Sequence, residues 1–330
     1  MVTIKKLTLK LKSGLLSELH SDTVMGHFCW RMLDKFGETK LKEFIELYNK
    51  KEAPVFTISN GLLEKGGELF FPRPLIYVKN AGANEKEKSK KEKIIDLLKN
   101  KDMKSINQLT TNQFNLAING KIKELYESIL NDKIERPKYE TDLRVSVEID
   151  RRFFSSKKGQ LFSYNPKFLD SRNTNVVLLI KVLNQEMFKH FHCGDILKDV
   201  FEIGFGKKKS SGYGQFEVVG EITEYNEIKE PDNPDAFICL GNYLPSASDN
   251  ISSECYYDFI VKYGRLGEEK SLSENPFKKP LIMFIPGSIF KTSTKKEFYG
   301  KVTQPGDISE YDLYSVHFGM TFTLHFNLLI

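Results

Sequence analysis

The sequence lacks several features that mark particular classes of protein. Its 330 residues include only four cysteines, none of them in a CxxC pair, so neither a zinc site of paired cysteines nor a disulfide framework is indicated. No apolar run reaches the roughly 18 residues that a membrane span needs, and the first residues have no apolar signal-peptide core. We therefore expect a cytoplasmic protein with no membrane contact and with buried or incidental thiols.

The chain also has little net charge, but its charge is unevenly distributed. The 49 basic and 44 acidic residues give a net charge of +5. Basic residues exceed acidic ones over residues 1–220, and acidic residues exceed basic ones over 221–330. This asymmetry favours a polyanionic partner for the first two thirds of the chain. A solvated lysine-rich surface without such a partner is the alternative interpretation.

Hydrophobic periodicity predicts an α+β protein. We expect strands over residues 7–11, 143–149, 176–183, 216–219, 237–240, 256–261, 281–285 and 314–328. We expect helices over 24–36, 39–48, 122–130 and 185–203, the first ending at Gly37 and the last interrupted at Gly194. The strict alternation of apolar residues at the C-terminal end predicts a single long closing strand.

The order of these elements predicts two domains. Strand, helix, strands, helix and strand follow one another as in a ferredoxin-like (RRM-like) unit, which we expect over residues 1–223 with a lysine-rich insertion at about 81–105. The acidic, proline-bearing stretch 224–235 is the predicted linker, and 236–330 is a second, β-rich ferredoxin-like domain. The predicted fold class is thus α+β, with two ferredoxin-like domains, insertions, and a glycine-rich loop before the last strand of the first domain.

That loop, GFGKKKSSGYGQF at residues 204–216, is the most informative motif. Its spacing matches neither a P-loop nor GxGxxG, which removes the main support for nucleotide hydrolysis. Its glycines allow close backbone approach, its three lysines can neutralise phosphates, and Tyr213 can stack on a base. We predict a clamp for a phosphate backbone with one base platform. A lysine-rich hairpin turn is the alternative.

Five further motifs resemble, in the same order, the RAMP superfamily of CRISPR-associated proteins. They are HSDTVMGHFCW at 20–30, FPRPL at 71–75, EIDRRFFSSKKGQLF at 148–162, KKPLIMFIPGSIF at 278–290 and FGMTF at 318–322. The resemblance covers the whole chain and is to the Cas-five-like fourth subunit of the Csm (type III-A) effector complex. The 148–162 segment departs from the family pattern, because it has Phe153, Phe154 and Ser155 where most relatives end in a threonine-glycine pair.

The resemblance implies a noncatalytic subunit without a cofactor that holds the 5′ tag of the CRISPR RNA. It also implies contacts with the large palm-containing Csm subunit and with the backbone RAMP Csm subunit. A helix N-terminus, arginines and a stacking ring suit single-stranded RNA, although Asp22 is better interpreted as a helix cap than as an RNA ligand. The residues that the resemblance assigns to RNA binding are Ser21, Asp22, Thr23, Arg73, Arg151, Arg152, Gly204, Gly206, Lys207, Lys208, Lys209, Ser210, Ser211, Gly212, Tyr213, Gly287 and Ser288.

Two other functions stay open at this point. Some relatives are metal-independent endoribonucleases with a histidine near the first helix, where this chain has His20 and His27. A protein-only assembly scaffold would explain the acidic second part but not the lysine loop. His190, His192 and Cys193 have a superficially metal-binding spacing, but they lie in a predicted helical stretch where residues i and i+2 point apart, and no second ligand pair is near them in sequence. We therefore expect no catalytic residues and no metal site.

Overall fold

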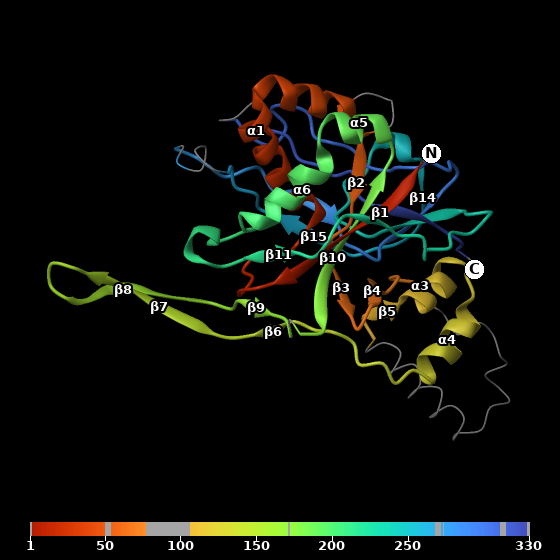
Figure 1. Cartoon of the computed structure of the whole chain (residues 1–330). Helices are drawn as coiled ribbons and strands as arrows, with labels where there is room; N and C mark the ends of the chain where they lie inside the picture. Colours follow the sequence, from red (N-terminus) through yellow and green to blue (C-terminus); the bar gives the residue numbers. More distant parts are fainter. Residues whose placement is uncertain are drawn as a thin grey trace.

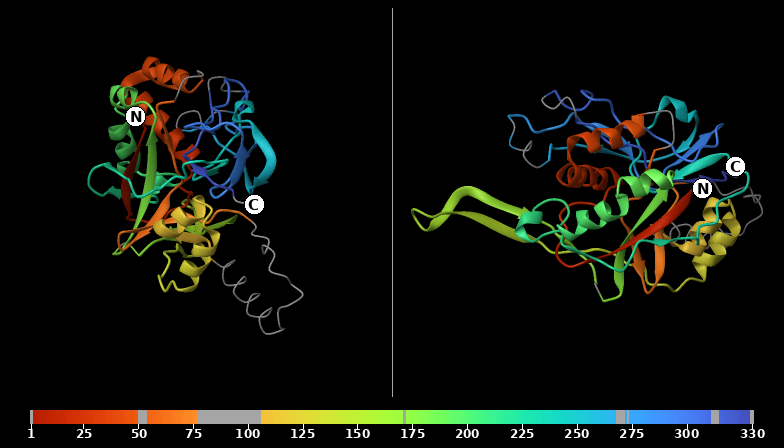
Figure 2. Two further views of the ribbon diagram at one scale, coloured as in Figure 1. Left: turned by 90° about the vertical axis from the view of Figure 1, so that its right-hand side faces the viewer. Right: turned by 45° about the horizontal axis from the view of Figure 1, so that its top comes forward.

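The computed structural model describes residues 2–49, 54–76, 106–170, 172–267, 272, 274–310 and 315–328. The predicted lysine-rich insertion at about 81–105 lies outside these residues. The chain folds into a mixed α/β structure in which every strand pairing of the described part is antiparallel (Figures 1 and 2). None of the helices in the described ranges combines the length and apolar character that crossing a bilayer requires.

An eight-stranded sheet forms the centre of the molecule. The main path of the sheet has the order β11-β1-β10-β3-β4-β5, while β12 pairs with β1 and β2 pairs with β10. The strand bounds are β1 (Thr3–Leu11), β2 (Phe56–Ile58), β3 (Leu62–Lys65), β4 (Glu68–Pro72), β5 (Gln108–Thr110), β10 (Thr174–Val182), β11 (Phe216–Val218) and β12 (Thr223–Glu224). Nearly all of β10 is buried, because both faces of the sheet are covered.

Helices cover one face of this sheet. They are α1 (Ser21–Asn49), α5 (Gln185–His190) and α6 (Cys193–Glu202), which lie together above the sheet in Figure 1. Leu7 and Leu9 of β1 and Leu178 of β10 pack in the same core as Phe28 and Phe44 of α1. The alternation predicted for the first strand is therefore present, and it directs Leu7 and Leu9 toward the helices.

Two glycines expected to interrupt helices behave differently. The two helices predicted on either side of Gly37 are both present within α1, where Gly37 separates them with a non-helical backbone whose φ is 80°. The break between α5 and α6 is at His192, which has a left-handed conformation, and the prediction that Gly194 interrupts this region was wrong. Gly194 lies inside α6, where a Cβ atom would make only ordinary contacts with Ile222 and Phe188.

The other face of the sheet is covered by α3 (Thr111–Ile118), α4 (Ile122–Leu130) and the C-terminal part of the chain. Val177 and Leu179 of β10 share a core with Phe114 of α3, Ile238 and Leu324. The C-terminal part thus packs directly on the central sheet, and the division into two ferredoxin-like domains stays a prediction. Tyr225, in the expected linker, is buried in this core.

The C-terminal part contains a four-stranded sheet and a separate two-stranded ribbon. The sheet has the order β14-β17-β13-β18. The bounds are β13 (Ala236–Cys239), β14 (Ile251–Tyr256), β17 (Ile289–Thr292) and β18 (Thr323–Phe326) in the sheet, and β15 (Phe259–Lys262) and β16 (Leu281–Phe284) in the ribbon. The strand expected over 256–261 is therefore divided between β14 and β15.

The long closing strand expected over 314–328 is much shorter than predicted. Within residues 315–328, which the structure describes, only Thr323–Phe326 is a strand, while Phe318 and Thr321 make isolated bridges. The backbone of Gly319 donates to Lys301 O and accepts from Leu244 N, so this region pairs with loops instead of with one neighbouring strand. Phe318, Phe322, Leu324, Phe326 and Leu328 are buried, but so are Thr321, Thr323 and His325 between them, so the alternation in sequence is not an alternation in burial.

The part of the chain between α4 and β10 forms a hairpin arm that projects from the body (Figures 1 and 2). It consists of β7 (Arg144–Asp150) and β8 (Ser155–Tyr164), with the short pair β6 (Glu140–Thr141) and β9 (Lys167–Phe168) at its base. Several of its large apolar side chains are exposed, among them Val145 and Leu161.

Candidate nucleic-acid interface

The glycine-rich loop follows α6 and leads into β11, as the sequence predicts for residues 204–214. Gly214 has a φ of 63°, and a Cβ atom at this position would lie 2.0 Å from the carbonyl oxygen of Phe205. No other residue can therefore occupy this position without moving the backbone. Lys208 also has a left-handed conformation, with φ at 60°, and Lys209–Ser211 form one turn of 3₁₀ helix.

The segment that follows β1 holds this loop in place. Ser17 Oγ accepts a hydrogen bond from the backbone N–H of Lys207 at 2.8 Å, and Gly14 O accepts one from the N–H of Gly214 at 2.9 Å. The side-chain amide of Gln215 donates to Lys209 O at 3.2 Å. These bonds fix the backbone of the loop while the side chain of Lys207 stays exposed.

The loop meets the base of the hairpin arm through aromatic and cationic side chains. Lys208 Nζ lies 3.7 Å from the ring centroid of Tyr164 and 5.3 Å from that of Phe162. The rings of Tyr164 and Tyr213 are perpendicular, with centroids 5.8 Å apart. Hydrogen bonds with Ser146 and with Lys208 lower the pKa of Tyr164.

We call Phe162, Tyr164, Lys207, Lys208 and Tyr213 the loop–hairpin surface. It joins two motifs that the sequence analysis treated separately, at 148–162 and 204–214. Ammonium groups and ring faces at one place can bind the phosphates and the bases of a single strand together. Sequence reasoning missed Tyr164, which lies just beyond the motif. The signal that could have found it is the pair of aromatic residues at positions 162 and 164, which alternation places on one face of a strand.

The tip of the arm carries the other predicted arginines. Arg151 and Arg152 lie in the turn between β7 and β8, beside Phe153 and Phe154, which are 74% and 90% exposed. Arg152 pairs with Asp150 at 3.4 Å. The arm separates this tip from the loop–hairpin surface, so the structure does not bring the two arginines to the lysine loop (Figure 1).

The predicted residues at the start of α1 contact the C-terminal part of the chain. Asp22 Oδ2 lies 2.6 Å from Lys262 Nζ and 3.3 Å from His317 Nε2, and Asp22 Oδ1 accepts from Asn242 Nδ2 at 2.8 Å. Burial alone would raise the pKa of Asp22, but His317 and Lys262 together lower it well below its usual range. Asp22 therefore links α1 to the C-terminal part of the chain.

Ser21 and Thr23 belong to the same junction. Ser21 Oγ accepts from the backbone N–H of Asn242 at 3.0 Å, and Thr23 Oγ1 accepts from Lys262 Nζ at 3.1 Å. Ser21 and Asp22 are both buried. Their polar groups are thus occupied by protein partners rather than turned toward a surface.

The predicted residues Arg73, Gly287 and Ser288 form a second junction. A Cβ atom at Gly287 would lie 2.6 Å from Arg73 O, and the N–H of Leu75 donates to Gly287 O at 2.9 Å. Ser288 is buried, and its hydroxyl donates to Asp258 O. The FPRPL and PGS segments therefore contact each other, away from the glycine-rich loop.

The candidate catalytic and metal-binding residues are spread apart. His20 Nδ1 lies 3.1 Å from Lys262 Nζ, and burial followed by the charge of Lys262 lowers the pKa of His20. His27 packs against the ring of Phe205. His190 contacts Lys40, and Cys193 is buried. Within the described ranges, no group of three or more His, Cys, Asp and Glu side chains could hold a metal ion.

Sequence comparisons find nothing similar: no protein-family model and no curated protein matches this chain. Solved structures do match it over its whole length. A Csm3–Csm4 subcomplex of the type III-A CRISPR–Cas interference complex aligns with a TM-score of 0.64 at 19% identity, covering 98% of this chain and 100% of that chain. The fold of the present chain is thus Csm4-like.

Two structures of a Csm1–Csm4 cassette agree with this assignment of the fold. The complex with pppApA aligns with a TM-score of 0.60 at 16% identity, covering 100% of this chain and 99% of that chain. The complex with cA4 aligns with a TM-score of 0.60 at 15% identity and covers both chains completely. The RAMP resemblance inferred from the motifs is thus confirmed at the level of the fold.

Proposed function

We propose that this chain is a noncatalytic RNA-binding subunit of a type III-A CRISPR interference complex, and that it holds the 5′ tag of the CRISPR RNA. The observation that carries this proposal is the loop–hairpin surface, where Lys208 lies against Tyr164 beside Tyr213 and the exposed Lys207. Single-stranded RNA is bound through phosphate contacts and through stacking of its unpaired bases, and this surface offers both.

The shape of the loop also suits this role. Its backbone is fixed by bonds to Ser17 and Gly14 before any ligand arrives. A preformed site loses less conformational entropy on binding than a site that must become ordered. We assign RNA binding to the loop–hairpin surface and leave out Ser21, Asp22 and Ser288, since these three side chains are buried.

We further propose that the chain bridges the large palm-containing subunit to the backbone RAMP subunit. The support is the similarity in fold, over the full length of the chain, to structures described as Csm1–Csm4 and Csm3–Csm4 assemblies. A subunit that contacts two proteins needs surfaces away from the RNA. The exposed apolar side chains Phe259, Val261 and Ile282 of the β15–β16 ribbon provide one.

The proposal of a noncatalytic role rests on how the histidines are placed. Cleavage next to a 2′-hydroxyl needs a base and an acid on either side of the scissile phosphate. His20 contacts Lys262, and the nearby carboxylate of Asp22 is already bound by Lys262, His317 and Asn242. His27 is half-buried and packs against the ring of Phe205, so it does not complete a pair with His20.

Sequencing the RNA that copurifies with the chain tests this function. The chain would be expressed in a CRISPR-bearing host together with a tagged backbone subunit, and the bound RNA extracted and sequenced. We expect RNAs that share one 5′ tag, because the proposed site holds that end. RNA with random 5′ ends, or a complex that contains this chain but no RNA, would contradict the proposal and favour the scaffold.

A further inference from the structure

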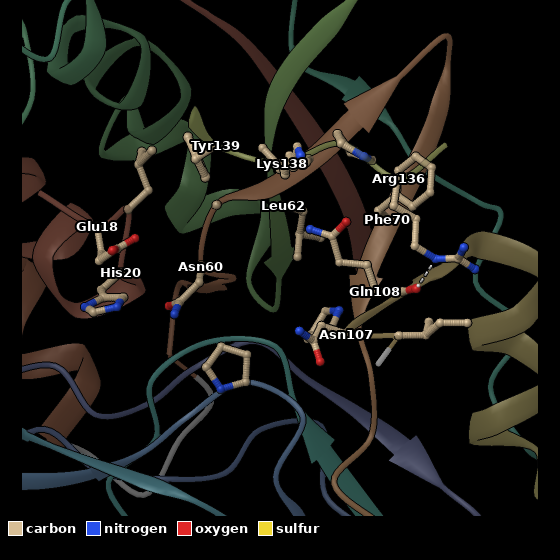
Figure 3. Close-up of a pocket in the computed structure, with 17 residues that line it drawn as sticks. Glu18, His20, Asn60, Leu62, Phe70, Asn107, Gln108, Arg136, Lys138 and Tyr139 are labelled. Atoms are coloured by element: carbon tan, nitrogen blue, oxygen red, sulfur yellow. Dashed lines mark hydrogen bonds between the residues drawn. The ribbon is translucent and has the colours of Figure 1, made fainter. Parts of the chain in front are cut away.

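An open cavity of about 690 Å³ lies beside the loop–hairpin surface. Its walls come from β3–β5, from residues 18–20 before α1, from the segment 136–139, and from Pro286 (Figure 3). Its volume lies within the range of roughly 300–1,000 Å³ that is typical of small-molecule sites. No residue predicted to bind RNA lines it, and its lining comes from segments that are far apart in sequence.

Flat apolar groups form part of the walls. Phe70 of β4, Pro137, Tyr139 and Pro286 all line the cavity; Phe70 and Pro137 are buried within its wall, whereas Tyr139 and Pro286 are partly exposed and can be reached by a ligand. Rings of this kind stack against the planar face of a base or of another aromatic ligand. The cavity therefore suits a planar heterocycle better than an extended aliphatic chain.

The polar groups of the cavity are mainly amides. The side chains of Asn107 and Gln108 face the cavity from β5 and the segment before it, opposite Asn60 and His20 (Figure 3). Their backbone carbonyls are already used, since Asn107 O accepts from Arg73 N and Gln108 O accepts from Arg136 Nε. Their side-chain amides make no hydrogen bond with any residue in the described ranges. Each can donate and accept at once, as recognition of a base edge requires.

Cations lie at the rim. Lys138 is exposed, and Arg136 is oriented by Asp132 Oδ2 at 2.7 Å. Lys167 lies 5.5 Å from the ring centroid of Tyr139 and pairs with Glu18. Ammonium and guanidinium groups around a planar slot fit the phosphates that flank a base.

The cavity is continuous with the loop–hairpin surface along the chain. Ser17, which binds the backbone of Lys207, immediately precedes Glu18 in the cavity wall. Tyr164 of the loop–hairpin surface is followed three residues later by Lys167 at the cavity rim. One short single strand could therefore contact both places.

We infer that this cavity binds one unpaired nucleotide, with its base between the aromatic and proline walls and the base edge on the amides of Asn107 and Gln108. If the nucleotide belongs to the bound RNA, the inference rests on the proposed function. A free mononucleotide has the same chemistry and is the second possible source of the bound nucleotide.

The test uses the full chain, a variant with Asn107→Leu and Gln108→Met, and a control with Asn226→Leu and Gln304→Met. The first variant keeps the size of the side chains and removes the amides from the cavity, and the control makes the same changes at positions outside it. Circular dichroism verifies that all three proteins are folded. Affinity is measured by fluorescence anisotropy for a tag-bearing RNA and for copies with one abasic nucleotide at each position in turn.

We expect one abasic position to weaken binding to wild type and to the control by roughly 5- to 150-fold, the value of one stacked base. The cavity variant should bind the intact RNA as weakly as wild type binds that abasic RNA. Placing the abasic nucleotide in the RNA should not weaken its binding to the cavity variant any further. Titration with adenosine monophosphate distinguishes the source. If wild type binds adenosine monophosphate and the cavity variant does not, while every abasic RNA loses as much affinity for the cavity variant as for wild type, a free nucleotide occupies the cavity.

The inference is overturned if the abasic losses are the same in the cavity variant as in wild type and adenosine monophosphate binding is absent or unaffected. This failure is distinguishable from failure of the proposed function. If wild type binds no RNA, the proposed function is wrong, and the titration with adenosine monophosphate still decides whether the cavity takes a nucleotide.

Discussion

The carboxylate of Asp22 gives a quantitative test of how α1 is joined to the C-terminal part. Its side chain is 2% exposed and contacts Lys262, His317 and Asn242. Asp22→Ala leaves the Lys262 ammonium group, which is 17% exposed, without its carboxylate. Removing one partner of a buried ion pair lowers the free energy of unfolding by about 3–5 kcal/mol, because the other charge stays desolvated. We expect a loss of this size.

Urea unfolding followed by the fluorescence of Trp30 measures this loss. Trp30 is the single tryptophan, lies in α1 and packs against Gly267, so it reports on the junction itself. The matched control is Asp34→Ala in the same helix, which removes a half-exposed carboxylate 3.2 Å from Arg31 and should cost at most about 1 kcal/mol. If Asp22→Ala destabilises the chain no more than Asp34→Ala does, the junction contributes little and the reasoning is refuted.

The same ion pair predicts a direction for the pH dependence. The pKa of Asp22 is lowered in the folded chain, whereas an unfolded aspartate titrates near about 3.9. Its contribution is therefore fully present above the unfolded pKa and is lost as the pH falls through the folded pKa. The difference in stability between wild type and Asp22→Ala should shrink below about pH 4. A difference that grows on acidification would contradict this assignment.

Two further results are expected of the proposed RNA subunit. Tyr213→Ala should weaken RNA binding by roughly 5- to 150-fold with no change in salt dependence, because a stacked ring releases no ions, whereas Tyr257→Ala on the C-terminal part should have no effect. Purified chain should leave end-labelled CRISPR-repeat RNA intact with or without magnesium, and cleavage that His20→Ala abolishes would instead identify a processing enzyme.

Much of the fold follows from local patterns in the sequence. Leu7, Leu9 and Leu11 alternate because β1 has one face against α1, and the continuous apolar run of β10 reflects burial on both faces. The glycine-rich loop could be located because its four glycines all have a positive φ, and one of them, Gly214, also lies against the carbonyl oxygen of Phe205. The closing strand was overestimated, since alternation of apolar residues does not determine which backbone groups pair, and here the residues between them, such as Thr321 and Thr323, are buried as well.

The rest of the site depends on contacts between distant segments. Asp22 resembles a helix cap in sequence, and its partners Asn242, Lys262 and His317 are more than 200 residues away. The cavity has the same origin, because Glu18, Asn107 and Tyr139 become neighbours only through the sheet. Arg151 and Arg152 are basic and aromatic-flanked, as expected of RNA ligands, but a projecting arm separates them from the loop.

The salt dependence of RNA binding tests the central claim most directly. The measurement compares wild type with Lys207→Ala/Lys208→Ala/Lys209→Ala and with a control in which Lys121, Lys123 and Lys229 become Ala. The control lysines are exposed around α3 and α4, which follow β5 at the opposite edge of the sheet from β11.

The slope of log affinity against log salt should fall by about 0.7 for each phosphate that a lysine no longer neutralises, so by roughly 2 in the loop variant, and it should change little in the control. Unchanged affinity and slope in the loop variant would show that the loop is a structural turn and that the RNA binds elsewhere.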